Sequence, residues 1–263
     1  MVSGRSSQQT FFGASALLFA GSAGLTIVWC GSTSAMGKMP MAGGWAMSMT
    51  WMRMPGQTWI EAAASFLAMW VVMMGAMMLP SLMPMLWRYR QAVGGEGESR
   101  LGRLTALVGI GYFFVWTLFG LTVFPLGVAL AIVEIENPTL ARAVPVAVGT
   151  VILLAGALQL TPWKAHYLAC CRGAPENGRI LPDDAGTAWR QGLRFGIHCG
   201  LSCANLTVIL LVIGVMDLRA MAVVMAAITT ERLTPAGEHL ARTIGAFIVA
   251  AGAILILRAV GLG

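Results

Sequence analysis

The sequence predicts an all-α protein: a polytopic transmembrane helix bundle of about seven helices, forming one domain over residues 1–263. Composition is the first reason, because 57% of the residues are hydrophobic and only 11% are charged, whereas soluble domains carry about a quarter charged residues. The second reason is that the apolar residues gather into stretches near the ~20 residues that a helix needs to cross a hydrocarbon core. We therefore expect an integral membrane protein with the lipid bilayer as a partner.

Seven apolar stretches follow one another along the chain. The second is longer than one crossing requires, and Pro80 and Pro84 are expected to kink or end it, because proline removes a backbone donor. The sixth is short, since Arg219 and Arg232 bound it, so we expect a short or re-entrant helix there. The stretches are residues 11–30, 59–86, 104–133, 144–162, 192–215, 219–232 and 240–260.

The first stretch has two interpretations. It is either a retained helix or a signal peptide, with Arg5 ahead of an apolar core at 11–29 and a small-residue site at Thr33-Ser34-Ala35. The apolar core is long for a signal peptide, which favours the retained helix. The number of helices falls to six if this segment is cleaved or if the sixth stretch is re-entrant.

Basic residues orient the bundle, because cytoplasmic loops collect Lys and Arg. With a cytoplasmic N-terminus, twelve of the 17 basic residues fall on the cytoplasmic side, Lys164 and Arg232 among them. The outer side keeps Lys38, Arg53, Arg142, Arg219 and Arg258. This orientation predicts a Met-rich extracytoplasmic loop at 31–57 and a cytoplasmic loop at 163–191. The net charge of +6 follows from topology and does not indicate a nucleic-acid partner.

Methionine is concentrated in one window of the chain. Fourteen of the 18 methionines lie between Met36 and Met85. Thioether sulfur is a soft ligand for Cu(I) or Ag(I), and the loop lacks the His and Cys that Zn(II) and Cu(II) prefer. We predict that this loop binds Cu(I); the alternative is an amphipathic loop that rests on the membrane surface. The candidate ligands are Met36, Met39, Met41, Met47, Met49, Met52 and Met54.

A methionine stripe continues inside the second helix. Met69, Met73 and Met77 recur every four residues and so share one face, with Met74 and Met78 on an adjacent one. Packing or lipid contact explains most such stripes. This one begins where the loop ends, so we also consider it a relay that carries the ion toward the cytoplasm.

Four of the five cysteines lie toward the cytoplasmic side of the predicted bundle. Two follow the fourth helix, and two stand one turn apart in the fifth helix with a histidine beside them. Thiols stay reduced on that side, and ligand-capable residues inside a membrane indicate a functional site. We interpret Cys30 as structural because it stands alone. The candidate metal ligands here are Cys170, Cys171, His198, Cys199 and Cys203.

Four motifs, in order along residues 59–260, resemble those of a known family. They are Met69-Trp70-x2-Met73-Met74-x-Ala76-Met77-Met78-x-Pro80-Ser81, Thr161-Pro162-Trp163-Lys164 followed by Cys171-Arg172, Gly192-x3-Gly196-x2-Cys199-x3-Cys203, and Glu231-Arg232-Leu233-x-Pro235-x-Gly237. The chain resembles a bacterial family described as predicted metal-binding integral membrane proteins, some of which are regarded as copper chaperones for oxidases of the tyrosinase kind. Many relatives carry a Cys-Cys pair followed by Trp where this chain has Cys203-Ala204-Asn205.

The resemblance implies a copper-handling protein of the bacterial inner (cell) membrane, multi-pass, with a copper enzyme or a soluble copper carrier as recipient. Our leading hypothesis is a Cu(I) chaperone or conduit that binds copper through Met and Cys ligands. We do not expect an enzyme, since three scattered histidines are too few for the usual copper or iron catalytic centre.

Two other classes of protein stay open. A membrane thiol oxidoreductase explains the cysteine pairs, although a one-turn spacing within a helix is poor for a direct disulfide. A non-catalytic scaffold subunit of a membrane complex explains methionine as adaptable packing. Both alternatives predict a protein without bound copper, so a measurement of bound metal distinguishes them from the copper hypothesis.

Overall fold

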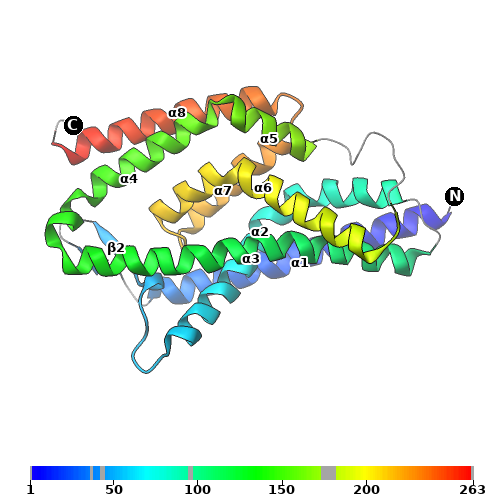
Figure 1. Cartoon of the computed structure of the whole chain (residues 1–263), viewed down its shortest axis with the longest axis horizontal. Helices are drawn as coiled ribbons and strands as arrows, with labels where there is room; N and C mark the ends of the chain where they lie inside the picture. The colour runs from blue at the N-terminus through cyan, green and yellow to red at the C-terminus, as the bar shows by residue number, and fades with distance from the viewer. Residues whose placement is uncertain (1, 36–37, 42–44, 94–96, 173–181, 262–263) are drawn as a thin grey trace.

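The computed structural model describes residues 2–35, 38–41, 45–93, 97–172 and 182–261. Helices dominate this part of the chain, and the longest of them lie antiparallel along one axis (Figure 1). The elements are α1 (Val2–Ala35), β1 (Lys38–Pro40), β2 (Ala46–Ser48), the 3-10 turn η1 (Met49–Trp51), α2 (Trp59–Val93), α3 (Glu98–Glu136), α4 (Pro138–Gln159), α5 (Pro162–Arg172), α6 (Ala185–Ile213), α7 (Leu218–Leu233) and α8 (Gly237–Ala259).

The all-α prediction is confirmed, and each of the seven apolar stretches coincides with a helix. Six helices are long and apolar enough to cross a membrane: α1, α2, α3, α4, α6 and α8. The sixth predicted stretch is α7, which has 16 residues and is not one of these six. One helix was not predicted, because the α5 sequence is short and too polar to stand out as an apolar stretch. It occupies the start of the segment 163–191 that the sequence predicted to be a loop.

Helix α2 does not end at its prolines. It continues past Pro80 and Pro84 to Val93, so of the two expected effects, a kink or an end, the end is wrong. Proline removes one backbone donor, and this loss is tolerated where neighbouring helices enclose the affected turn. Leu79, Ser81 and Leu82 on either side of the first proline are all buried.

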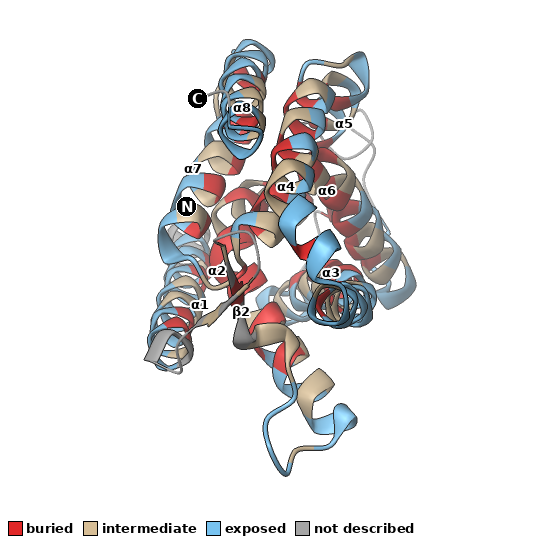
Figure 2. Cartoon of the chain, turned by 90° about the vertical axis from the view of Figure 1, so that its left-hand side faces the viewer, coloured by how far each residue is buried: buried red, intermediate tan, exposed pale blue. Residues whose placement is uncertain are grey.

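Helices α2 and α6 form the interior of the bundle. In each, 56% of the most apolar stretch is buried, against at most 28% in the other four long helices. Figure 2 shows the buried faces turned toward this interior, while the outer faces of the peripheral helices are exposed. Every side chain discussed below as a candidate ligand on α2 or α6, apart from His198, is buried.

Trp70 fixes how α2 is rotated against α3. Its indole Nε1 donates a hydrogen bond to the Trp116 carbonyl oxygen at 2.8 Å. The ring lies over Gly120, where an added Cβ would come within 2.6 Å of it. Because the indole sits on one side of α2, its anchoring determines which methionines of that helix face the interior.

Helices α4 and α8 lie side by side and approach closely through glycine (Figure 1). A Cβ at Gly252 would lie 2.6 Å from the backbone nitrogen of Leu153, and one at Gly156 would lie 2.7 Å from that of Val249. Small residues of this kind let two membrane helices pack backbone against backbone. The pair forms one side of the bundle.

We expect Gly252→Ala to lower the free energy of unfolding by about 1–3 kcal/mol, because the new methyl group forces α4 and α8 apart. The matched control is Gly109→Ala on α3, where nothing lies within 4 Å of an added Cβ. Thermal unfolding of both variants in detergent provides the measurement. Equal midpoints for the two variants would contradict this account of the α4–α8 contact.

Candidate metal-binding site

The centre of the site is a pair of thiols on α6. Cys199 and Cys203 stand one turn apart, and both side chains are fully buried. Their sulfur atoms lie 3.6 Å apart, and both cysteines are free. The Cys203 thiol donates to the Cys199 carbonyl oxygen at 2.7 Å. The one-turn spacing predicted that these two thiols share a face, and they do.

A third sulfur reaches this pair from α2. The Met78 Sδ lies 4.0 Å from the Cys199 Sγ. Together Cys199, Cys203 and Met78 form what we call the thiol cluster. The proposed relay was Met69, Met73 and Met77, all of which are buried, but the methionine with a sulfur contact to the thiols belongs to the adjacent stripe. On the other side, the Tyr112 hydroxyl lies 2.8 Å from the Cys199 Sγ.

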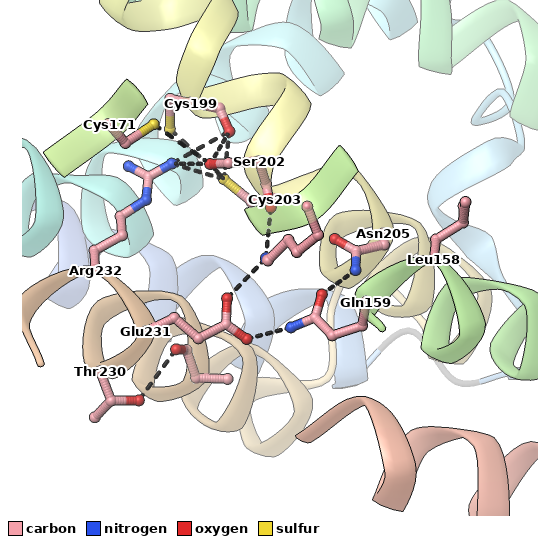
Figure 3. A network of polar contacts seen from close by, with 12 residues as sticks. Leu158, Gln159, Cys171, Cys199, Ser202, Cys203, Asn205, Thr230, Glu231 and Arg232 are labelled. Atoms are coloured by element: carbon pink, nitrogen blue, oxygen red, sulfur yellow. Dashed lines mark hydrogen bonds and ion pairs between the residues drawn. The ribbon is translucent and has the colours of Figure 1, made fainter. Parts of the chain in front are cut away.

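Arg232 brings a positive charge to the thiol cluster. One of its terminal nitrogens, Nη2, lies 3.2 Å from the Cys203 Sγ and donates to the Ser202 Oγ at 2.6 Å and the Cys199 carbonyl oxygen at 3.2 Å (Figure 3). The other, Nη1, donates to the Ser81 Oγ at 3.3 Å. Its side chain is buried, and within the described ranges no carboxylate forms an ion pair with it. The guanidinium is therefore in direct contact with a sulfur atom, a hydroxyl group and a backbone carbonyl.

A second set of charges lies next to the first. The Lys164 ammonium forms an ion pair with the Glu231 carboxylate at 2.7 Å, and both side chains are only 2% exposed. Lys164 also donates to the Ser202 carbonyl oxygen at 2.6 Å. Gln159 donates to Glu231 and accepts from Asn205, which extends the network from α7 through α4 to α6 (Figure 3).

The charge count used to orient the bundle assigned Lys164 and Arg232 to cytoplasmic segments, whereas the structure buries both side chains inside the bundle. Both are buried among the helices, held by Glu231 in one case and by thiols and hydroxyls in the other. Without these two residues, the sequence assigns ten basic residues to the cytoplasmic side and five to the outer side.

The adjacent cysteines of α5 point in different directions. Cys171 is buried, with its Sγ 3.6 Å from the Ser202 Oγ, and so lies beside the thiol cluster. Cys170 is exposed, and its sulfur lies 3.8 Å from the His166 Nε2. The sequence placed both together at the cytoplasmic face, whereas the structure brings only one of them into the interior.

His198 is next to Cys199 in sequence but is directed elsewhere. Its ring lies near that of Tyr167, with the two centroids 6.0 Å apart. The Nδ1 atom is buried and has no hydrogen-bond partner among the described residues. Successive residues of a helix point about 100° apart, so adjacency to Cys199 did not place this imidazole with the thiols.

The Met-rich loop folds into a small hairpin against the bundle. Met39 and Met47 are direct partners in the antiparallel register of β1 and β2, and Met47 is buried. The Trp45 indole donates to the Ala141 carbonyl oxygen at 2.9 Å, which ties the hairpin to α4. Met41 and Met52 are half-buried and Met54 is exposed. Met36 lies outside the described residues, as do details of the Met49 side chain.

The donor set at the thiol cluster is therefore sulfur. Among the described residues, no group of three or more His, Cys, Asp or Glu side chains is arranged to hold a metal ion. Two thiols with a thioether suit a soft monovalent ion, whereas Zn(II) sites take four ligands from Cys, His and carboxylates. The geometry favours Cu(I) or Ag(I) over the common divalent ions.

Comparison with known families gives a match. A family model, PpoB2, described as a copper chaperone, matches residues 67–255, which is more than half of the chain. The chain belongs to the PpoB2 family of copper chaperones. The matched range contains every member of the thiol cluster together with Arg232, and it excludes the Met-rich hairpin and Cys30. No curated protein and no solved structure matches the chain.

Membership of the PpoB2 family gives the protein a copper-handling role. The resemblance found in its sequence motifs is thereby confirmed. The sequence analysis named Lys164, Glu231 and Arg232 in motifs, and the two basic residues in the charge count, but assigned none of them to the site. The signal that could have found them is physical: charged residues inside apolar membrane segments are costly and mark sites.

We expect Glu231→Gln to destabilise the fold by about 3–5 kcal/mol, because it leaves the buried Lys164 ammonium without its counter-charge. The double variant Lys164→Met with Glu231→Gln removes both charges and is expected to recover a large part of that loss. Thermal or denaturant unfolding in detergent measures both. If the double variant is no more stable than Glu231→Gln alone, the pair does not act as described.

Proposed function

We propose that this PpoB2 protein is a membrane copper chaperone or conduit that holds Cu(I) between Cys199 and Cys203, with Met78 as a third sulfur. The observation that carries the proposal is the 3.6 Å separation of two free, buried thiols with a thioether 4.0 Å from one of them. Copper is cargo here, so we propose no catalytic step.

The spacing of the sulfurs suits one shared ion. A metal–sulfur bond is about 2.3 Å long, so two sulfurs 3.6 Å apart can both reach an ion that lies between them at a bent angle. A bent pair leaves one side of the ion open for a further ligand. The Met78 thioether, which comes from another helix and lies 4.0 Å from the Cys199 Sγ, can supply that ligand.

Charge balance supports a monovalent ion. Cu(I) bound by two thiolates carries a net charge of −1, which the Arg232 guanidinium neutralises at close range. A divalent ion bound by the same thiolates makes a neutral complex, so it lacks this attraction to the guanidinium. The same argument assigns Arg232 the role of a positioning residue for the complex.

The position of the thiol cluster along the bundle axis suggests at which membrane surface copper is transferred to the recipient. Helices α4 and α8 have 22 and 23 residues, or ~33–35 Å at 1.5 Å per residue, which is about one bilayer crossing. Helix α4 ends at Gln159, which contacts Asn205 of α6, so the cluster one turn away lies near the end of that crossing. We infer a position near one membrane surface, which is the cytoplasmic one for an N-terminus inside.

The remaining candidate ligands define a route to and from the thiol cluster. We propose that the hairpin methionines, Met39 and Met47 among them, capture Cu(I) outside the bacterial inner membrane and that the buried methionines of α2 conduct it inward. Cys171 beside Ser202 and Cys170 beside His166 then form an exit toward the recipient. The recipient is a copper enzyme or a soluble copper carrier.

A thiol oxidoreductase fits these contacts less well. Such a protein passes electrons between cysteine pairs that approach each other. Cys170 and Cys171 diverge, one to the surface and one into the bundle. A scaffold role does not explain why the Arg232 guanidinium contacts the Cys203 thiol. The approach of Cys199 and Cys203 also suits a redox pair, but the match to a copper chaperone family favours a shared copper ion.

We expect the double variant Cys199→Ser with Cys203→Ser to lose about one equivalent of tightly held copper, because it removes both thiolates. The protein is purified in detergent, loaded with Cu(I) under anaerobic reducing conditions, washed with a Cu(I) chelator and assayed by elemental analysis. Ala204→Ser is the control, since it adds a hydroxyl to the same turn of α6 and removes no sulfur. Copper retained equally by all three proteins would refute the thiol cluster as the copper site.

Arg232→Gln is expected to weaken Ag(I) or Cu(I) binding by about tenfold or more relative to Cd(II), because the complex loses its counter-charge; tenfold corresponds to ~1.4 kcal/mol. Arg232→Lys keeps the charge and should keep the preference for the monovalent ion. Competition titrations of the two ions measure the ratio, which a purely structural effect would not shift. An unchanged ratio in Arg232→Gln contradicts the charge argument.

A further inference from the structure

Cys30 is not isolated in the fold. It lies near the end of α1, and its Sγ lies 3.8 Å from the Sδ of Met216 in the turn between α6 and α7. These two sulfurs are 186 residues apart in sequence. The Cys30 side chain is 2% exposed, so this contact is inside the molecule.

Three more methionines line the gap beside this contact. Met69 and Met73 from α2 and Met221 from α7 line one small gap together with Cys30 and Met216. The gap is too narrow for a water molecule, and its other lining residues are Thr26, Trp29 and Val72. Met69, Met73 and Met221 are each at most 6% exposed. We call these five sulfur-bearing residues the Cys30 cluster.

We propose that the Cys30 cluster is a second soft-metal site, which binds Cu(I), or Ag(I) in its place, through the Cys30 thiolate and surrounding thioethers. The inference rests on the proposed function in that the ion is the same cargo. One thiolate with neutral thioethers makes a neutral complex with Cu(I), which an apolar setting accepts without a counter-ion. Binding displaces the thiol proton of Cys30 to solvent, so charge and atoms balance.

The chemistry of the gap supports an ion rather than simple packing. Methionine fills irregular space, but five sulfur-bearing residues from four separate segments line this one gap, with no carboxylate or imidazole among the lining residues. The Trp29 ring is among the lining residues, and an indole face attracts a cation. Asp217 follows Met216 directly and caps α7, placing a carboxylate next to the cluster in sequence.

The Cys30 cluster and the thiol cluster are joined by α2. Met73 belongs to the first and Met78 to the second, and a rise of 1.5 Å per residue separates them by ~7.5 Å along the helix. Met74 and Met77 lie buried between them. An ion that moves along α2 therefore finds sulfur ligands at successive helical turns. One thiolate binds it at the Cys30 cluster, and two thiolates bind it at the thiol cluster. The greater number of thiolates makes the thiol cluster the tighter site, which favours transfer from Cys30 toward Cys199.

The test compares copper stoichiometry in matched variants of the full chain. The protein in detergent is titrated with Cu(I) under anaerobic reducing conditions, and bound copper is measured at increasing concentrations of a Cu(I) chelator. We expect Cys30→Ser with Met216→Leu to lose about one equivalent, the one that the chelator removes first. The variant Cys199→Ser with Cys203→Ser should instead lose the equivalent that resists the chelator. Met225→Leu, one turn beyond Met221 and outside the gap, is the control and should lose none.

Each result separates the two proposals. If the Cys30 variant keeps every equivalent while the α6 variant loses one, the second site is wrong and the proposed function stands. If the α6 variant also keeps every equivalent, the proposed function is wrong. If the double variant at Cys30 does not fold, Cys30→Ser alone, which exchanges sulfur for oxygen, carries the same expectation. X-ray absorption spectroscopy of the copper that stays bound to the variant Cys199→Ser with Cys203→Ser should show sulfur as the only neighbouring ligand atom.

Discussion

A buried guanidinium that faces sulfur instead of a carboxylate is the interaction on which the interior depends. Arg232 of α7 reaches Ser81 on α2 and the backbone and side chains of α6 around Cys199. Glu231, the residue before it, holds Lys164 of α5 and Gln159 of α4. Two consecutive residues thereby connect four other helices at one level of the bundle. Burying this much charge is costly, so the surrounding contacts have to be satisfied for the fold to persist.

This constraint accounts for the unusual helices. Helix α7 is too short to be counted among the membrane-spanning candidates, and α5 is shorter and polar. Both helices place charged or thiol side chains in the interior: Arg232 and Glu231 come from α7, and Lys164 and Cys171 come from α5. Polar segments inside an apolar bundle are tolerated where the surrounding protein satisfies their polar groups. The longer helices supply that enclosure.

The two sulfur clusters differ in how the charge of a bound ion is balanced. The thiol cluster has two thiols and a cation beside them, whereas the Cys30 cluster has one thiol and thioethers around it. Bound to Cu(I), each arrangement is electrically neutral. Membership of a copper chaperone family is consistent with sites that hold and release a soft ion through exchange between sulfur ligands.

The sequence by itself determined what depends on neighbours along the chain. Its apolar stretches gave all seven longer helices, and the one-turn spacing of Cys199 and Cys203 placed both thiols on one face. It missed α5, whose polar residues become buried only because other helices surround them. It also grouped His198 with the thiols because His198 is next to Cys199 in sequence, but the rotation of the helix directs the imidazole ring toward Tyr167.

Tertiary structure alone decided which distant side chains meet. The anchoring of Trp70 on α3 sets the rotation of α2, and so decides that Met78 contacts the thiols. Arg232 reaches Cys203, and Met216 reaches Cys30, across separations that no local period encodes. The physical reason is that hydropathy and helical spacing act within a segment, whereas the sites are built from contacts between segments, which only the packing of the whole bundle specifies.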